Sequence, residues 1–150
     1  MQEARPPDLE LGPIDQVSYV VEDLESALPG YEALFGPFQV AESPLEGCTI
    51  RGRTADCRLK LAVNRSGPVE IELIQVLEGE TPHSEHLRAH GEGLHHVRFR
   101  VGDLEKTVDR LAARGYRELF YKRFGPTIAF AYLETPKALG GSVIELLEMP

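Results

Sequence analysis

Four polar residues stand inside apolar, strand-like stretches and carry donor atoms that a metal ion prefers. They are an amide, an imidazole and two carboxylates: Gln16, His96, Glu72 and Glu145. Glu72 has aliphatic neighbours in VEIELIQV (69–76), and Glu145 has them in SVIELLEM (142–149). A carboxylate among aliphatic side chains is costly unless it is paired, hydrogen-bonded or bound to a cation. These four residues are therefore the first candidates for chemistry.

The two histidines of GEGLHHVRFRV (91–101) fall on opposite faces of an expected strand. Positions 97, 99 and 101 are apolar and alternate with polar residues, a period of two that is typical of a half-buried strand. His96 then shares the polar face with Arg98, and His95 lies on the apolar face. We interpret His96 as a candidate ligand or base and His95 as a structural residue.

An internal repeat brings the four candidates into two equivalent pairs. IDQVSYVVEDLESAL (14–28) aligns with LHHVRFRVGDLEKTV (94–108), and VEIELIQV aligns with SVIELLEM further along each copy. Two matches in the same order arise by chance less easily than one, so we interpret the pattern as a duplication. The alignment places Gln16 over His96 and Glu72 over Glu145.

A divalent ion held between the two halves would satisfy all four groups. A nitrogen and oxygen donor set without sulfur suits a six-coordinate ion that keeps positions open for water or substrate. Cobalt, manganese, nickel, iron, zinc and magnesium all remain open. So does the plainer interpretation, in which His96 and the glutamates are merely solvated or salt-bridged.

Each half is expected to form a strand, a helix and three further strands. An Asp N-cap precedes each helix, with Glu in the first turn. Gly115 marks the end of the second helix, whereas Pro29-Gly30 predicts a short or kinked first helix. The additional strands are expected near 39–43, 58–63, 117–124 and 128–134, and a short helix near 84–89. We expect one domain over 1–150, with modules at about 13–77 and 93–149 and a linker at 78–92.

Composition favours a globular protein that acts on small molecules. The chain has 150 residues, 42% of them hydrophobic and 27% charged, and no apolar run is long enough to span a membrane. The net charge of −8 argues against nucleic acid as a partner. The N-terminus lacks a signal-peptide pattern, so a cytoplasmic location is expected. Cys48 and Cys57 match no zinc or redox spacing.

These residues and motifs resemble the vicinal oxygen chelate superfamily over residues 13 to 149. The resemblance rests on IDQVSYVVEDLESAL, EGETPHSEHLRAHGEGLHHV and GGSVIELLE, and GEGLHHV followed by a DLE helix start is most similar to the methylmalonyl-CoA epimerase branch. It implies an α+β fold in which two βαβββ modules form a cup-shaped mixed β-sheet with helices outside. It also implies a homodimer and a divalent metal held by Gln16, Glu72, His96 and Glu145. Most metal-binding relatives have histidine where Gln16 stands, and glutamine is a weaker ligand.

The activity implied by the resemblance is metal-dependent stabilisation of an enolate, as in epimerases and glyoxalases. Glu145 would then exchange protons with the substrate as well as bind the metal. Arg98 either receives a substrate carboxylate or pairs with a local acid at the rim, and both interpretations remain open. We expect Tyr132 to line the cup. Glu46 is a weaker candidate base, and Lys137 could meet an anionic substrate. The substrate would be an acyl-CoA or another hydrophobic carbonyl compound.

Two other functions remain open at this point. A ring-cleaving oxygenase of this superfamily usually has two histidine ligands, whereas the set here contains His96 alone. The second is a metal-free binding protein of the bleomycin-resistance type, in which Gln16 would indicate a lost metal site.

Overall fold

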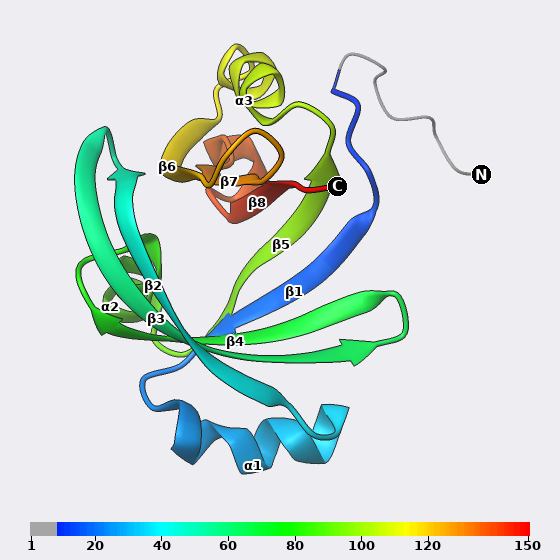
Figure 1. Ribbon diagram of the computed structural model, residues 1–150, viewed down its shortest axis with the longest axis vertical. Helices are drawn as coiled ribbons and strands as arrows, with labels where there is room; N and C mark the ends of the chain where they lie inside the picture. The colour runs from blue at the N-terminus through cyan, green and yellow to red at the C-terminus, as the bar shows by residue number, and fades with distance from the viewer. Residues whose placement is uncertain (1–8) are drawn as a thin grey trace.

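The computed structural model describes residues 9–150, which form a mixed eight-stranded sheet with three α-helices outside it (Figure 1). The first half consists of β1 (Ile14–Val20), α1 (Leu24–Phe35), β2 (Gln39–Ile50), β3 (Arg53–Ser66) and β4 (Val69–Glu78). After α2 (Pro82–His90), the second half consists of β5 (Gly93–Val101), α3 (Leu104–Ala112), β6 (Arg117–Arg123), β7 (Ala129–Glu134) and β8 (Val143–Glu148). The predicted α+β class and the order of elements in each module are confirmed.

The sheet closes on itself in the order β1-β4-β3-β2-β6-β7-β8-β5. β1 runs parallel to β4, and β5 runs parallel to β8, so each module closes in the same way. The two modules join where β1 and β5 pair antiparallel, and there Val17 lies opposite Val97. Because Val17 and Val97 are equivalent in the repeat, a local two-fold axis passes between them. The residues just before these valines, Gln16 and His96, are therefore related by the axis, and their side chains meet on one face of the sheet.

The first helix is longer than the sequence predicts. α1 continues through Pro29 to Phe35, so the expected shortening at Pro29-Gly30 is wrong. The helix is held by its apolar side: Leu24 is fully buried, and the Tyr31 ring packs 5.0 Å from the Tyr19 ring of β1. Tertiary packing of this face outweighs the backbone hydrogen bond that proline removes.

β2 and β3 also extend beyond the predicted 39–43 and 58–63. They form a long hairpin whose turn places Arg51 and Gly52 at positive φ angles of 48° and 80°. A shift in the pairing between Leu45 and Cys48 interrupts the alternation of side chains, which explains why the pattern predicted only part of each strand. No helix in residues 9–150 is long and apolar enough to cross a membrane.

Three groups of buried apolar side chains support this arrangement. One lies beneath α1, a second lies beneath α3, and the third fills the inside of the closed sheet. The inner group includes Leu59, Ile74, Phe120 and Tyr132. It leaves room for a cavity, and the four candidate residues lie at the wall of that cavity or just behind it.

Candidate metal centre

The four candidate residues converge at one place. His96 Nε2 lies 3.0 Å from Gln16 Oε1, 3.0 Å from Glu145 Oε1 and 3.9 Å from Glu72 Oε1. All four residues are buried, with Gln16 only 1% exposed and Glu72, the most accessible, 9% exposed. Two oxygen donors and an imidazole nitrogen within hydrogen-bond distance, with a third oxygen nearby, suit a small divalent cation.

Strand register explains why these residues meet. Gln16 and His96 lie diagonally across the β1–β5 pair, on either side of Val17 and Val97. In the parallel pairs, Glu72 lies beside Ser18 of β1, and Glu145 lies beside Arg98 of β5. Ser18 and Arg98 are themselves equivalent in the repeat. Each module thus brings one glutamate from its last strand toward the shared two-fold axis.

The two carboxylates are held in a setting that favours their neutral form. Burial, together with the charge of Glu145, raises the pKa of Glu72, and the hydroxyl of Ser18 partly opposes this by donating a hydrogen bond of 2.9 Å to Glu72 Oε1. Burial likewise raises the pKa of Glu145. Two such acids close together are readily ionised only if a positive charge compensates them. This supports the fit of a cation to the site.

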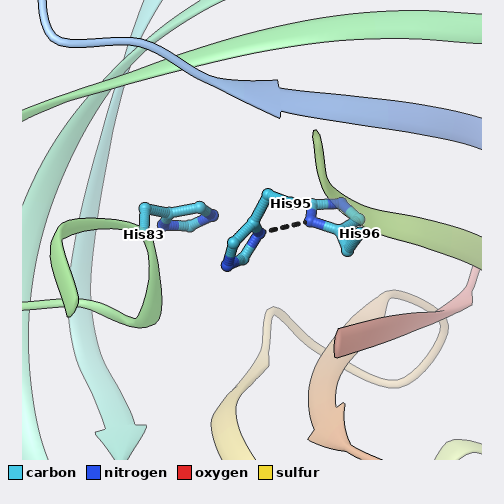
Figure 2. A group of neighbouring side chains, drawn as sticks. All are labelled: His83, His95 and His96. Atoms are coloured by element: carbon cyan, nitrogen blue, oxygen red, sulfur yellow. Dashed lines mark hydrogen bonds between the residues drawn. The ribbon is translucent and has the colours of Figure 1, made fainter. Parts of the chain in front are cut away.

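His96 is held as a neutral ring. Burial, aided by the charge of Arg98, lowers the pKa of His96 to about 3. Its second ring nitrogen, Nδ1, lies 2.8 Å from Nδ1 of His95, and Figure 2 shows the bond between the two rings. If His96 Nε2 offers its lone pair to a metal, the ring proton sits on Nδ1 and is donated to His95. A hydrogen bond of this kind orients an imidazole ligand and fixes its tautomer.

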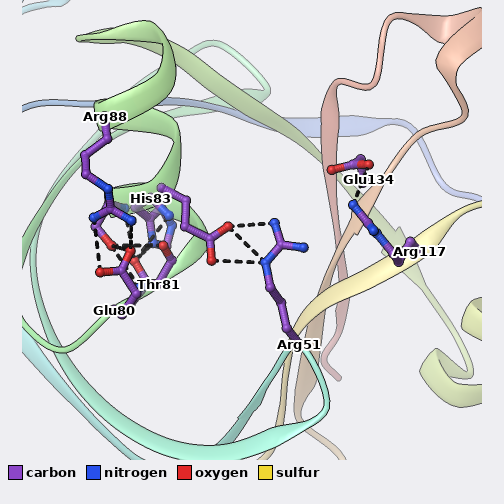
Figure 3. Close-up of polar contacts among 9 residues, drawn as sticks. Arg51, Glu80, Thr81, His83, Arg88, Arg117 and Glu134 are labelled. Atoms are coloured by element: carbon purple, nitrogen blue, oxygen red, sulfur yellow. Dashed lines mark hydrogen bonds and ion pairs between the residues drawn. The ribbon is translucent and has the colours of Figure 1, made fainter.

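A second hydrogen-bond chain reaches the site from the start of α2. The hydroxyl of Thr81 caps the helix by accepting hydrogen bonds from the backbone N–H groups of His83 and Ser84, so its own hydrogen is left to donate to His83 Nδ1 at 3.1 Å (Figure 3). His83 Nε2 must then carry the ring proton, and it donates to the hydroxyl of Tyr132 at 3.0 Å. Tyr132 in turn donates a hydrogen bond to Glu145, its neighbour across β7 and β8, which holds the pKa of that acid down.

His83, His95 and His96 also form a group that could bind a metal, because one nitrogen of each lies within 4.8 Å of the others (Figure 2). Both ring nitrogens of His83 are engaged, however, one with Thr81 and one with Tyr132. The bond between His95 and His96 also uses a nitrogen of each ring. In the four-residue set, His96 Nε2 is likewise within hydrogen-bond distance of Gln16 Oε1 and Glu145 Oε1. These contacts join the donors themselves, so a bound ion would replace contacts within the set.

Arg98 belongs to a layer of ion pairs behind the site. Its guanidinium binds both oxygens of Asp15, at 2.8 and 3.2 Å, and lies 3.7 Å from Glu70. Glu70 also accepts a hydrogen bond of 2.7 Å from Gln16 Nε2, which leaves Gln16 Oε1 free to face His96. Sequence reasoning missed Asp15 and Glu70. Glu70 could have been found, because it lies two residues before Glu72 on the same strand face.

A cavity of about 190 Å³ opens beside the site inside the sheet. Glu72, Glu145 and Tyr132 form its polar end together with Ser43. The rest of its wall is apolar and includes Leu45, Leu59, Ile74, Phe120, Phe124 and Phe130. Tyr132 therefore lines the interior as the sequence predicts, whereas Arg98 lies behind the cavity wall. A larger cavity of about 400 Å³ is lined partly by His86, His90 and His96, and none of the described residues that line it is Asp or Glu.

The weaker candidates lie away from this cavity. Glu46 is exposed, and its backbone carbonyl accepts a hydrogen bond from Lys122. Lys137 lies in the short 3-10 turn before β8 and is exposed. Neither residue is among those that line the cavity, so their chemical roles stay predictions without support from this geometry.

Comparison with known proteins agrees with the expected resemblance. A family model described as the glyoxalase/bleomycin resistance protein/dioxygenase superfamily matches residues 15–132. Similar solved structures include methylmalonyl-CoA epimerase from Mycobacterium tuberculosis, with a TM-score of 0.64 and 23% identity over 94% of this chain and 90% of that chain. A variant of the Streptomyces coelicolor methylmalonyl-CoA epimerase, in complex with 2-nitronate-propionyl-CoA, is also similar. Its TM-score is 0.63, with 21% identity over 93% of this chain and 98% of that chain.

A hypothetical protein from Bacillus halodurans is similar to the same extent, with a TM-score of 0.65 and 20% identity over 92% of this chain and 94% of that chain. Among curated proteins, none matches. At these identities the solved structures establish the fold.

Proposed function

Because the chain belongs to the glyoxalase/bleomycin resistance protein/dioxygenase superfamily, we propose that it is a metal-dependent enzyme that stabilises the enolate of a carbonyl substrate. The reaction would be of the epimerase or glyoxalase type. The observation that carries this proposal is the convergence of Gln16, Glu72, Glu145 and His96 beside a mostly apolar cavity.

The four residues would hold the ion through an amide oxygen, two carboxylates and His96 Nε2. A bound divalent ion supplies Lewis-acid stabilisation of negative charge on the substrate oxygen. His95 orients the His96 ring through the Nδ1–Nδ1 hydrogen bond. Glu70 orients Gln16 by accepting its amide N–H, so that the oxygen faces the site.

Proton transfer falls to the acids that line the cavity. Among the described residues of its wall, the carboxylates are Glu72 and Glu145. Glu145 would take the α-proton: the C–H bond breaks, its electron pair moves toward the carbonyl oxygen, and the carboxylate gains the proton. Glu72 comes from the other module and is the group available to return a proton from a different direction. Tyr132 holds Glu145 through its hydroxyl hydrogen.

The structural neighbours named as methylmalonyl-CoA epimerases support an acyl thioester as one substrate class to test. We propose that an acyl-CoA or another hydrophobic carbonyl compound binds with its reactive end in the cavity. The expected homodimer stays a prediction, and so do the cytoplasmic location and the identity of the metal.

A second candidate is a metal-free binding protein for small apolar molecules. It is favoured by one observation: His96 Nε2 can donate a hydrogen bond to Gln16 or Glu145 at 3.0 Å, so the polar groups also satisfy one another without an ion.

Exchange of substrate hydrogen for deuterium separates the two functions. The protein is loaded with Co²⁺ and incubated in D₂O with acyl thioesters and α-hydroxycarbonyl compounds, and loss of the α-proton is followed by NMR. The enzyme proposal expects exchange that disappears in Glu145→Gln and persists in Glu134→Gln, a control acid on β7 that does not line the cavity. Binding of ligands without exchange across the panel would favour the metal-free binding protein.

A further inference from the structure

The charge balance of the site restricts the kind of substrate it can take. Gln16 and His96 are neutral ligands, whereas Glu72 and Glu145 each carry a negative charge when a cation is bound. The two carboxylates therefore cancel the charge of a divalent ion. A centre of this composition has no positive charge left over to attract an anionic ligand.

The surroundings do not restore a positive charge. Arg98 is the nearest buried cation, but Asp15 binds it at 2.8 Å and Glu70 lies 3.7 Å away. Arg100 also lies 3.7 Å from Asp15, so two guanidinium groups face two carboxylates and this layer is close to neutral. An anion that entered the site would meet neither a free cation nor a favourable potential.

The side chains that line the cavity also disfavour an anionic group inside it. Among the described residues that line it, none is Lys, Arg or His. Apart from Ser43, Tyr132 and the two glutamates, the lining side chains are aliphatic or aromatic. Near the rim, Lys122 lies 5.6 Å from the ring centre of Phe124 and donates a hydrogen bond to the backbone carbonyl of Glu46. A charged tail outside the cavity is compatible with Lys122, but a charged group inside would lose its hydration without compensation.

We propose that the part of the substrate that enters this cavity is uncharged, and that Glu72 sets this preference. The chemical class is a neutral, apolar carbonyl compound, such as an α-hydroxyketone, a diketone or a simple acyl derivative. Malonyl-type groups, which carry a carboxylate at the reactive carbon, are disfavoured. This inference rests on the proposed metal-dependent function and deepens it by naming the substrate class.

The preference is measurable by binding alone. Mandelamide and mandelate are alike in shape and differ in charge, and each can offer two neighbouring oxygens to a metal. We would titrate each into the Co²⁺-loaded protein and follow the visible spectrum of the ion and the heat of binding. The native protein is expected to bind mandelamide at least about tenfold more tightly than mandelate, because a buried anion lacks a partner.

Glu72→Gln gives the sharper result. The substitution keeps an oxygen donor and nearly the same shape, and it leaves the centre with one net positive charge. The affinity for mandelate relative to that for mandelamide should rise about tenfold or more. Glu78→Gln is the matched control, because it makes the same change at the exposed end of the same strand.

Glu145→Gln is a second variant with the same change of charge in the other module, and it answers the question if Glu72→Gln does not fold. A native protein that prefers mandelate, or variants that leave the ratio of the two affinities unchanged, would overturn the inference while the metal-dependent function survives. Failure of the native protein to retain Co²⁺ would instead overturn the proposed function, and this inference with it.

Discussion

Gln16 Oε1 lies 3.0 Å from His96 Nε2, so two residues made equivalent by the internal repeat touch at the centre of the molecule. The contact follows from the register of β1 and β5, in which Val17 lies opposite its own counterpart Val97. A site built on a two-fold axis receives one donor of each kind from each module. Here the glutamates keep that symmetry, whereas the amide and the imidazole break it.

His96 is expected to dominate metal affinity. It supplies the nitrogen donor of the set, and its Nε2 is within 3.0 Å of two of the other ligands. His96→Ala should weaken binding of Co²⁺ or Zn²⁺ by roughly 100-fold or more, since even loss of an outer partner commonly costs 10–100-fold. Competition with a chromophoric chelator measures this. His90→Ala, at an exposed histidine of α2, should bind the ion as the native protein does.

Stability of the metal-free protein should peak near pH 6.5. Burial lowers the pKa of His95 to about 2 and that of His96 to about 3, and it also lowers the pKa of His83. Below pH 6.5 these three histidines bind protons in the unfolded chain only, which outweighs the two protons that the native protein holds on Glu72 and Glu145, so stability falls gently as pH falls. Burial raises the pKa of Glu72 to about 8 and that of Glu145 to about 7, whereas the unfolded chain has already released both protons. Above pH 6.5 the native protein therefore binds more protons, and stability falls as pH rises toward 8.

Thermal unfolding in the presence of a chelator, followed from pH 5 to pH 8.5, measures this profile. The double variant Glu72→Gln, Glu145→Gln should lose the decline above pH 6.5 and keep the decline below it. A melting temperature of the native protein that rises steadily to pH 8 would contradict the interpretation of these carboxylates as protonated in the metal-free state.

The repeat made the four central residues predictable, because a polar residue found twice at equivalent places in apolar strands needs a common explanation. The ion pair of Asp15 with Arg98 was beyond the same reasoning. A shift in the β1–β5 pairing between Ile14 and Gln16 breaks the alternation there, so strand periodicity does not predict where Asp15 points. The sequence therefore leaves open whether Arg98 receives a substrate carboxylate or pairs with a local acid, and in the structure its guanidinium is bound by Asp15.

His83 was missed for a different reason. It lies in the linker between the modules, so it has no counterpart in the repeat, and its partner Tyr132 is 49 residues away. The only signal in the sequence was Thr81-Pro82 at the start of a short helix, which predicts a cap but not a contact with the site. Long-range hydrogen bonds of this kind depend on packing that local patterns do not encode.

Tyr132 and His83 should act as a unit on metal affinity. His83 fixes the direction of the Tyr132 hydroxyl, so that its hydrogen goes to Glu145. Tyr132→Phe and His83→Phe should each weaken Co²⁺ binding by about 10-fold, the usual effect of losing an outer partner. The double variant should be no weaker than Tyr132→Phe alone. Additive losses would mean that the two residues support the site independently.

Loss of Arg98 is expected to lower the stability of the protein rather than to weaken substrate binding alone. Arg98→Met removes the closer partner of Asp15 in a mostly buried position and leaves Arg100 at 3.7 Å, so it should lower the free energy of unfolding by about 2 kcal/mol. Adding Asp15→Asn should recover much of that loss. Urea unfolding measures both variants. If Arg98→Met leaves stability intact and weakens only the binding of carboxylate ligands, then Arg98 receives the substrate after all.

Gln16→His tests whether the amide limits metal affinity. An imidazole is a better donor than an amide oxygen for most divalent transition metals, and the side chain is similar in size. The new ring can place one nitrogen near His96 and donate its N–H to Glu70, which replaces the bond that Gln16 Nε2 makes at 2.7 Å. Affinity for Co²⁺ or Zn²⁺ should rise about tenfold, which corresponds to ~1.4 kcal/mol.

Gln39→His is the control for this change, because it adds a histidine at an exposed position at the start of β2. A rise in affinity confined to Gln16→His would mean that the two-fold axis provides a working metal geometry and that the native amide tunes it. If Gln16→His binds the ion no better than the native protein, the donors do not share one ion. The hydrogen bonds between Gln16, His96 and Glu145 would then be structural, as the metal-free binding protein requires.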